Sequence, residues 1–318
     1  MNIIILEANT LGADVDLSIF EKLGNVTQYG QSNEENTAER VKDADIIVVN
    51  KVPMNEKTLK KADHLKMIAV TATGTNIIDL SYTNQRGIAV SNVGGYSTMS
   101  VAQHTFALAL YLIHKMNYFD TYVKSGEYIR SDIFTNLDIT YQELDGKTWG
   151  IVGLGNIGKK VAQIASVFGC RVIYYSTSGK NQNDQYERVD FDIICRESDV
   201  LSIHAPLNEA TENLMNRKAF QKMKKSAVLI NVGRGPIVNE NDLVEALEKG
   251  EIAAAGLDVI SAEPMKEGNP LMKIKDSKKL IVTPHIAWAS TEARQRLVQE
   301  VYWNVEAFLR GEKRNLVF

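Results

Sequence analysis

The stretch Thr148-Trp149-Gly150-Ile151-Val152-Gly153-Leu154-Gly155-Asn156-Ile157-Gly158 carries an apolar run into a glycine turn, and a helical pattern follows from Lys159 to Phe168. In such a turn the first glycine allows the tight bend, the second lets the backbone approach a diphosphate, and the third lets the helix pack closely on the strand. Free N–H groups at the helix start attract the diphosphate. A purely structural turn is the alternative, but the flanking strand and helix favour a dinucleotide site. Its candidates here are Gly153, Gly155, Asn156, Ile157 and Gly158.

Length and composition narrow the class of protein. A chain of 318 residues predicts about two domains, each able to bury its own core. The sequence is 44% hydrophobic and 24% charged, which is ordinary for a globular protein. Its net charge of -3 and its dispersed basic residues argue against a nucleic-acid or an anionic-membrane partner. A small molecule is the expected partner.

The cysteines and the N-terminus indicate the cellular setting. Cys170 and Cys195 fall in or beside apolar segments without metal-ligand spacing, so we expect buried free thiols and a reducing compartment. Residues 1–7 hold a short apolar run without a basic leader, which indicates a first strand and not a signal peptide. No apolar stretch approaches the ~20 residues that span a bilayer. We therefore expect a cytoplasmic protein.

Short apolar runs alternate with amphipathic segments through two blocks of the chain. In the first block the predicted strands are Ile3–Leu6, Val26–Tyr29, Ile46–Val49, Met67–Val70 and Ile88–Val90. In the second block they begin at Thr148 and continue at Arg171–Tyr175, Val200–Ile203, Val228–Asn231, Ala253–Leu257 and Leu280–Val282. This alternation predicts two α/β domains, each with a parallel sheet covered by helices. No glycine fingerprint follows the first strand, so the first block is not an obvious nucleotide site.

Three longer segments lie outside this alternation. Met99–Ser125 carries apolar residues at helical spacing and predicts one long helix that joins two domains. Gly126–Lys147 has weak periodicity and several aromatic residues, which fits an arm or an interface loop. Thr291–Leu309 predicts a final amphipathic helix, with Ser290 or Thr291 as its cap and Gly311 as its stop.

The second strand of the dinucleotide block bears on the choice of nucleotide. An NAD site usually places an acidic side chain at this strand end, where it binds the ribose hydroxyls. Here the strand ends in Tyr174-Tyr175-Ser176, so Ser176 stands in place of the acid, and no arginine stands beside it. Without that carboxylate a 2′-phosphate is tolerated, and the nearby Lys180 would attract it. We expect NAD(H), with NADP(H) left open.

Polar residues follow three later strands of the same block. Asn231-Val232-Gly233-Arg234-Gly235 comes first, then Asp258 with Glu263, and finally Thr283-Pro284-His285. Carboxyl ends of parallel strands form the edge at which open α/β sheets bind ligands. Hydride transfer to a 2-oxo acid needs a cation for its carboxylate and carbonyl and a proton donor for its oxygen, and Arg234 and His285 offer these groups. The alternative for Arg234 is a surface ion pair, and the alternative for Glu263 is a solvated acid in a loop. The joint placement of the two residues disfavours both alternatives.

These motifs resemble those of the D-isomer-specific 2-hydroxyacid dehydrogenase family, and the resemblance covers nearly the whole chain. It implies two Rossmann-like, doubly wound parallel-sheet domains. The outer, flavodoxin-like substrate domain would be discontinuous, with residues 1–98 plus 290–318, and the NAD(P)-binding Rossmann domain would span 99–289. The resemblance also implies an active site in the cleft and a homodimer.

Roles for single residues follow from the same resemblance. Arg234 looks like the substrate-binding arginine, His285 like the acid/base, and Glu263 like the carboxylate that orients the histidine and favours its protonated form. Asp258 resembles a contact of the nicotinamide end, and Thr73-Gly74-Thr75 matches a loop whose N–H groups hold the substrate carboxylate. Further cofactor-side candidates are His204, Pro206, Val232 and Gly233.

The remaining histidines indicate no metal centre. His64, His104 and His114 lie in or beside predicted helices, so we expect them to pack or to face solvent. None of the five histidines forms a cluster with spaced carboxylates. No metal is expected.

Within the family, His285-Ile286-Ala287-Trp288-Ala289-Ser290 is similar to the glycerate dehydrogenase, or hydroxypyruvate reductase, branch. This implies reduction of hydroxypyruvate to D-glycerate, with glyoxylate as a secondary substrate and Trp288 beside a small polar pocket. A packing role is the alternative for Trp288. Two other functions stay open: a broad 2-oxo-acid reductase for aliphatic substrates, and a nucleotide-sensing protein of the corepressor kind, since a fold alone does not fix a function.

Overall fold

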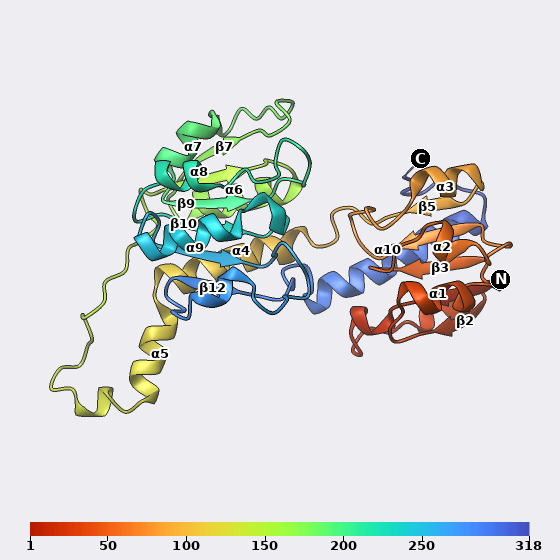
Figure 1. The fold of residues 1–318 in the computed structure, drawn as a ribbon, viewed down its shortest axis with the longest axis horizontal. Coiled ribbons are helices and arrows are strands. Elements are labelled where there is room, and N and C mark those ends of the chain that lie inside the picture. Colours follow the sequence, from red (N-terminus) through yellow and green to blue (C-terminus); the bar gives the residue numbers. More distant parts are fainter. Residues whose placement is uncertain (318) are drawn as a thin grey trace. The chain divides into compact units, whose positions relative to one another are not determined.

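The computed structural model of the protein describes residues 1–317 and divides into two compact units (Figure 1). The first unit combines Met1–Ser97 with the described chain from Ala289 onward, and the second is Thr98–Trp288. Each unit contains its own parallel sheet covered by helices, which confirms the predicted fold class.

The sheet of the first unit has the strand order β2-β1-β3-β4-β5, and every pair in it is parallel. Its strands are β1 (Asn2–Ile5), β2 (Asn25–Gln28), β3 (Ile46–Val49), β4 (Met67–Val70) and β5 (Ala89–Ser91). This is the flavodoxin-like order. All residues of β3 and β4 are buried, as expected for central parallel strands with both faces covered.

The helices of the first unit pack on this sheet from both sides. Ile47, Ile68 and Leu59 belong to one buried cluster, which includes residues of the segments around α1 and α2. The long helix α10 packs on β4, and its N-cap Ser290 accepts a hydrogen bond from the Ala293 N–H. The helices of this unit are α1 (Glu34–Arg40), α2 (Glu56–Leu59), α3 (Leu80–Gln85) and α10 (Thr291–Leu309), with 3-10 turns at Ala8–Leu11 and Ser18–Lys22.

The sheet of the second unit has the order β12-β11-β10-β9-β6-β7-β8, again all parallel. Counted from β6, this is the Rossmann order 3-2-1-4-5-6 with one further strand. The strands are β6 (Thr148–Val152), β7 (Arg171–Tyr175), β8 (Glu187–Arg188), β9 (Val200–Ile203), β10 (Val228–Asn231), β11 (Ala254–Leu257) and β12 (Leu280–Val282). The sequence did not predict β8, because its two residues are exposed and polar.

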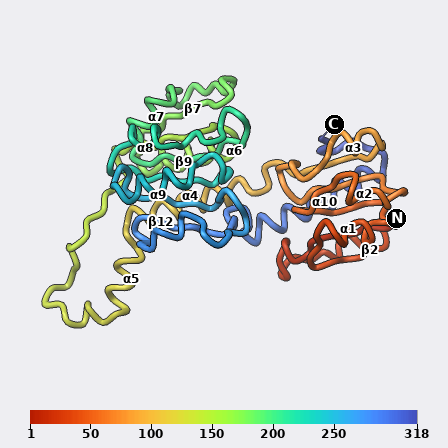
Figure 2. Tube along the Cα trace, in the orientation of Figure 1, coloured from red at the N-terminus to blue at the C-terminus, as the bar shows by residue number. Residues whose placement is uncertain are grey.

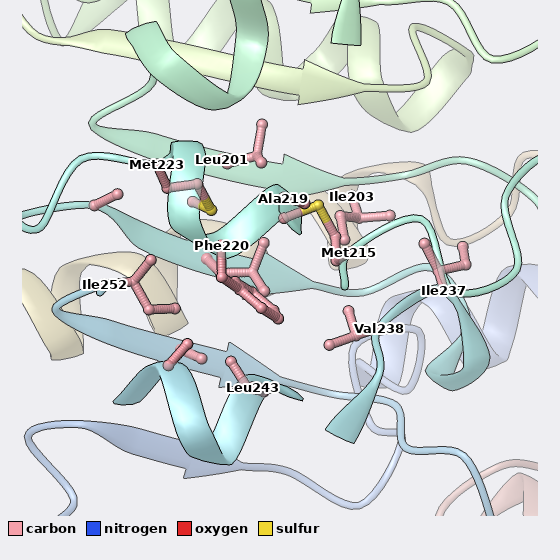
Figure 3. Packing of buried hydrophobic residues seen from close by; sticks show 14 of the residues in the cluster. Leu201, Ile203, Met215, Ala219, Phe220, Met223, Ile237, Val238, Leu243 and Ile252 are labelled. Atoms are coloured by element: carbon pink, nitrogen blue, oxygen red, sulfur yellow. The ribbon is translucent and has the colours of Figure 1, made fainter. Parts of the chain in front are cut away.

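Two layers of helices cover this second sheet. The helices α4 and α6 pack on one face around the buried Trp149. The other face carries α7, α8 and α9, and Figure 3 shows Phe220 of α8 lying among Leu201, Leu243 and other apolar side chains. The bounds are α4 (Thr98–Ile113), α6 (Asn156–Val167), α7 (Phe191–Glu197), α8 (Arg217–Lys222) and α9 (Glu240–Lys249), with 3-10 turns at Gly235–Ile237 and Pro270–Lys273.

The prediction of one helix over Met99–Ser125 was wrong. The structure has two helices, α4 and α5 (Met116–Lys124), separated by Lys115 in the left-handed conformation with φ 54°. A left-handed residue interrupts the hydrogen-bond ladder of an α-helix. The apolar packing that holds α4 ends near Leu112, and α5 buries none of its residues, so nothing continues the helix across the break.

The segment after α5 leaves the body of the second unit. Figure 2 shows α5 and the segment after it extending outward before the chain returns to the second unit, and this segment contains one 3-10 turn at Tyr128–Arg130. Ile129, Phe134 and Leu137 are 87%, 89% and 75% exposed. An arm of this kind agrees with the weak periodicity of Gly126–Lys147. Across residues 1–317, no helix is both long and apolar enough to cross a membrane.

Both cysteines are free and buried, as predicted. Burial raises the pKa of Cys170 to about 11 and that of Cys195 to about 12. Cys170 Sγ also donates to the Leu144 carbonyl at 3.3 Å. Both groups stay as thiols at neutral pH, which makes them packing residues and not nucleophiles.

Candidate active site

The glycine turn after β6 has the geometry that a diphosphate needs. Gly153 has φ 92°, and a Cβ placed there would stand 2.8 Å from the Ala205 Cα. A Cβ on Gly158 would collide with the Gly153 carbonyl oxygen, so helix and turn are in close contact. A Cβ on Gly155 would meet nothing within 4 Å. The three glycines thus supply the bend, the close packing and an open approach to the backbone.

The helix that follows the turn begins without a side-chain cap. Gly155 is the N-cap residue of α6, and no side chain accepts a hydrogen bond at this end within the described chain. The first N–H groups of a helix have no partner inside the helix. Those of Asn156, Ile157 and Gly158 are therefore available to an anion, and the helix dipole favours negative charge there.

His204 provides a second indication that this edge accommodates a ligand. Its Nδ1 is buried and has no hydrogen-bond partner among residues 1–317, while Nε2 lies 2.9 Å from the Ser202 hydroxyl. Ser202 in turn accepts a hydrogen bond of 2.9 Å from the Trp149 Nε1–H. Burial lowers the pKa of His204 to about 3, so the imidazole is neutral near pH 7. A buried polar atom without a partner is rare, and a bound cofactor would satisfy it.

The other cofactor-side candidates lie at ends of neighbouring strands. Ser176 follows β7 and is buried, and Pro206 is exposed in the segment after β9. Val232 is buried after β10. A Cβ on Gly233 would stand 3.0 Å from the Ala205 carbonyl oxygen, so these two strand ends touch. The residues at these ends fit a bound dinucleotide.

Arg234 lies in a loop that hydrogen bonds of a neighbouring residue hold in place. Asn231 fixes the loop, because its Oδ1 accepts the Gly233 N–H and its Nδ2 donates to the Arg234 carbonyl, each at 3.0 Å. Arg234 Nη1 donates to the Gly233 carbonyl at 2.8 Å. A Cβ on Gly235 would overlap the backbone of Ile260, so this loop packs directly on the segment that leads to Glu263.

His285 and Glu263 form a hydrogen-bonded pair. His285 Nδ1 lies 2.7 Å from Glu263 Oε2, and Glu263 Oε1 accepts the Ile260 N–H at 3.1 Å. Both side chains are partly exposed, at 26% and 34%. A carboxylate on Nδ1 fixes the orientation of the ring and leaves Nε2 for another molecule. The pair can therefore hold and transfer a proton.

The loop that carries His285 is held by Asp258, which is 1% exposed. Asp258 Oδ1 accepts from the Thr283 hydroxyl at 2.6 Å and from the Ile286 N–H at 2.9 Å, and Oδ2 accepts from the Ala287 N–H at 2.9 Å. Burial acts to raise the pKa of Asp258, but hydrogen bonds from His104, Thr283 and these N–H groups outweigh it and lower the pKa. Both carboxylate oxygens thus already bind the chain itself, and a nicotinamide contact of Asp258 stays a prediction.

The sequence did not predict the contacts that His104 makes in this network. Its Nε2 lies 3.0 Å from Thr283 Oγ1 and 3.4 Å from Asp258 Oδ1. Because the Thr283 hydroxyl donates to Asp258, the His104 nitrogen must donate. The sequence around His104 predicts only a helix. The contact with Thr283 could not be predicted, because it depends on the packing of α4 against the end of β12.

The other predicted substrate residues are Trp288, in the second unit, and Thr73, Gly74 and Thr75, in the first. Trp288 packs against the buried cluster around Trp149. The Thr73-Gly74-Thr75 loop belongs to the first unit and follows β4, and Thr73 Oγ1 donates to the Val93 carbonyl at 2.8 Å. Asn92 Nδ2 donates to the Thr73 carbonyl at 2.7 Å. Arg234, Glu263 and His285, in contrast, follow the neighbouring strands β10, β11 and β12 of one sheet.

The sequence of this chain is similar to those of known proteins. Residues 106–287 match the model of the D-isomer specific 2-hydroxyacid dehydrogenase NAD binding domain. The chain is 37% identical to a hydroxypyruvate reductase of Blautia hydrogenotrophica over 100% of this chain and 99% of that protein. It is 39% identical to a glycerate dehydrogenase of Methylorubrum extorquens, over 89% of this chain and 88% of that protein.

A solved structure is similar over the same length. The D-lactate dehydrogenase of Aquifex aeolicus, complexed with NAD and lactic acid, superimposes with a TM-score of 0.85 and 26% identity, covering 100% of this chain and 99% of that one. The fingerprint, the fold and these similarities over the full chain lead to one assignment. The chain belongs to the D-isomer-specific 2-hydroxyacid dehydrogenase family, NAD-dependent oxidoreductases that interconvert 2-oxo acids and D-2-hydroxy acids.

Proposed function

We propose that the chain reduces hydroxypyruvate to D-glycerate, with the second unit binding the cofactor and the first unit serving as the substrate domain. The observation that carries the proposal is the 2.7 Å contact between His285 Nδ1 and Glu263 Oε2. A histidine held by a carboxylate at a sheet edge suits proton transfer to an oxygen. Arg234 follows the adjacent strand and supplies a cation for the substrate.

The reduction forms one C–H bond and one O–H bond. A bound reduced nicotinamide would supply the hydride for the C–H bond. His285 donates the proton from Nε2 to the carbonyl oxygen of the substrate and becomes neutral. Glu263 accepts the hydrogen bond of Nδ1–H throughout, which holds the ring and stabilises the charged imidazole before the transfer. Arg234 binds the carboxylate through its planar fork of donors.

The remaining substrate contacts are proposed from the resemblance. Backbone N–H groups of Thr73, Gly74 and Thr75 are assigned to the substrate carboxylate, and Trp288 to the wall of a small polar pocket. Anchoring of the loop by Asn92 and Val93 supports the first assignment, because a fixed loop holds its N–H groups in place. The similarity to a hydroxypyruvate reductase over the full chain supports the choice of substrate.

The test is a set of substrates at equal concentration. Oxidation of NADH is followed with hydroxypyruvate, glyoxylate, pyruvate and 2-oxoisocaproate. We expect the highest kcat/KM with hydroxypyruvate, and glyoxylate second. Preference for 2-oxoisocaproate would replace this proposal with a broad reductase for aliphatic 2-oxo acids.

The role of Arg234 is tested in the same assay. Arg234→Ala should lower kcat/KM for hydroxypyruvate by about 10- to 100-fold, because a charge-assisted hydrogen bond to the carboxylate is lost. Arg196→Ala, at an exposed position of α7, is the matched control. Wild-type kcat/KM in the Arg234 variant would show that the carboxylate binds elsewhere.

We also propose a homodimer in which the arm after α5 contributes to the contact. Ile129, Phe134 and Leu137 expose apolar side chains on one short segment, and such an apolar surface favours association. Light scattering after gel filtration should give twice the chain mass. Phe134→Ser combined with Leu137→Ser should shift the protein toward monomer, whereas an unchanged dimer would exclude the arm.

A further inference from the structure

The loop after β7 lacks the carboxylate that would exclude a 2′-phosphate. Ser176 is 4% exposed, and its Oγ accepts the Asn181 N–H at 3.3 Å, which folds the loop back on itself. Thr177 and Ser178 add two hydroxyl groups, and Lys180 adds a cation. The Ser178 hydroxyl accepts the Lys180 N–H at 3.3 Å. This strand end therefore carries donors and positive charge.

An arginine lies beside this loop although none is adjacent in sequence. Arg188 belongs to β8, which pairs with β7 so that Arg188 stands opposite Tyr174. Its Nη1 donates to the Gly179 carbonyl at 3.0 Å, and this contact ties the guanidinium to the tip of the loop. The side chain is exposed and forms no ion pair among residues 1–317. Four of its five N–H donors stay available for a further acceptor.

The carboxylates close to Arg188 in sequence form no ion pair with it among residues 1–317. Its neighbour Glu187 forms an ion pair with Arg171 at 2.7 Å. Asp184, in the same loop, makes no ion pair with Arg188 or Lys180 within the described part of the chain. The guanidinium beside Gly179 is therefore not neutralised by an ion pair with these carboxylates, and it stays available to an anion at the loop.

We propose that Arg188 and the Ser176–Lys180 loop form a binding site for the 2′-phosphate of NADP(H), so that the enzyme accepts NADP(H) as well as NAD(H). NADP(H) differs from NAD(H) by this phosphate on the adenosine ribose. In a Rossmann unit the ribose lies at the end of the second strand, which is β7 here. An arginine binds phosphate through parallel N–H groups, and hydroxyl groups add further hydrogen bonds. The inference rests on the proposed placement of the dinucleotide at Gly153–Gly158.

The first experiment measures binding without turnover. Calorimetry compares adenosine 2′,5′-bisphosphate with adenosine 5′-monophosphate, which share every group except the 2′-phosphate. We expect the bisphosphate to bind at least about tenfold more tightly to the wild type, and Arg188→Ala to weaken it by about 10- to 100-fold while leaving the monophosphate unchanged. The control Arg196→Ala, an exposed arginine on α7, should change neither.

Two binding results would overturn the site. One is equal affinity of the wild type for both compounds. The other is equal weakening of both compounds by Arg188→Ala, which would place the arginine at a group common to them. Ser176→Asp tests the loop from the opposite side: a carboxylate there should weaken the bisphosphate and spare the monophosphate.

Turnover then separates this inference from the proposed function. With hydroxypyruvate, we expect kcat/KM for NADPH to equal or exceed that for NADH, and Arg188→Ala to lower only the NADPH value. Activity with NADH alone would overturn the 2′-phosphate site and leave the function standing. Selective binding of the bisphosphate, without turnover of hydroxypyruvate by either nucleotide, would support the site and refute the function.

Discussion

The two sheets share a parallel, doubly wound construction, yet the edges where their first strands end are chemically different. In the first unit Glu7 follows β1 and is buried, and its Oε2 accepts the N–H groups of Asn50, Lys51 and Val52 at 2.9, 2.7 and 3.1 Å. In the second unit the chain after β6 is a glycine turn, with an uncapped helix behind it.

The two units differ in the same way at the strand next to the first one, which is β3 in the first unit and β9 in the second. After β3 the backbone donors are satisfied by Glu7, whereas after β9 the Nδ1 of His204 has no partner within residues 1–317. In the first unit a carboxylate of the chain occupies the edge, and in the second the Nδ1 of His204 is left without a partner among residues 1–317. The shared topology thus leaves the binding of a nucleotide to a few residues at the strand ends.

The largest expected effect concerns the chemistry at the second edge. His285→Ala removes the proton donor, so kcat with hydroxypyruvate should fall by about 10²- to 10⁴-fold while the Kd of NADH stays the same. Steady-state kinetics and a fluorescence titration measure the two quantities. His64→Ala, an exposed position in the first unit, is the control. A variant with wild-type kcat would remove His285 from the reaction.

Gly153→Ala tests whether the turn is specialised for a ligand. It places a Cβ at a positive φ and against Ala205, which should lower the free energy of unfolding by about 1–3 kcal/mol and weaken NADH. Gly146→Ala is the matched control, because Gly146 also has a positive φ, 70°, but open space around its Cα. If both variants bind NADH like the wild type, the turn is only structural.

Glu7→Ala is the corresponding change at the first edge. Three N–H groups would lose their acceptor, so we expect the free energy of unfolding to fall by about 1–3 kcal/mol. The Kd of NADH should not change. Glu7→Gln keeps one acceptor oxygen and should lose less. Weaker NADH binding in a folded Glu7→Ala protein would contradict the contrast between the two edges.

The smallest effect is a pH dependence at His204. Its pKa is about 3 in the fold and returns to its ordinary value near 6.5 on unfolding, so between these limits the unfolded chain binds the extra proton. Stability is therefore lost as pH falls from 6.5, by at most about 1.4 kcal/mol per pH unit. Chemical denaturation at pH 7, 6 and 5 should give a shallower loss for His204→Asn. Parallel curves for both proteins would show that folding does not lower the pKa of His204.

Much of the fold was accessible from the sequence because buried parallel strands are continuous apolar runs. Each of the predicted strands is present, whereas β8 escaped because Glu187 and Arg188 are polar and exposed. The break at Lys115 also escaped, since α4 and α5 both carry helical periodicity and only packing distinguishes them. Short polar elements and helix breaks depend on contacts that a linear pattern does not contain.

The sequence indicated the candidate residues of the site, but not the hydrogen bonds from other elements that hold them. Arg234, Glu263 and His285 stand at strand ends in recognisable motifs, and the structure joins the last two by a hydrogen bond. His104 contacts Thr283, far away in sequence, and Arg188 reaches the Gly179 carbonyl because β8 pairs with β7, so spacing could not reveal either contact.

The dependence of the His285 loop on Asp258 has a consequence for exchanging parts between relatives. His285 has φ 55°, and its N–H donates to the Asp258 carbonyl at 2.9 Å, while the Asp258 carboxylate holds Ile286 and Ala287 from the end of another strand. Residues 283–288 are thus not a portable module. A graft of this hexapeptide into another Rossmann scaffold would need an aspartate at the matching end of the neighbouring strand, and a donor in the place of His104, before the histidine could keep its geometry.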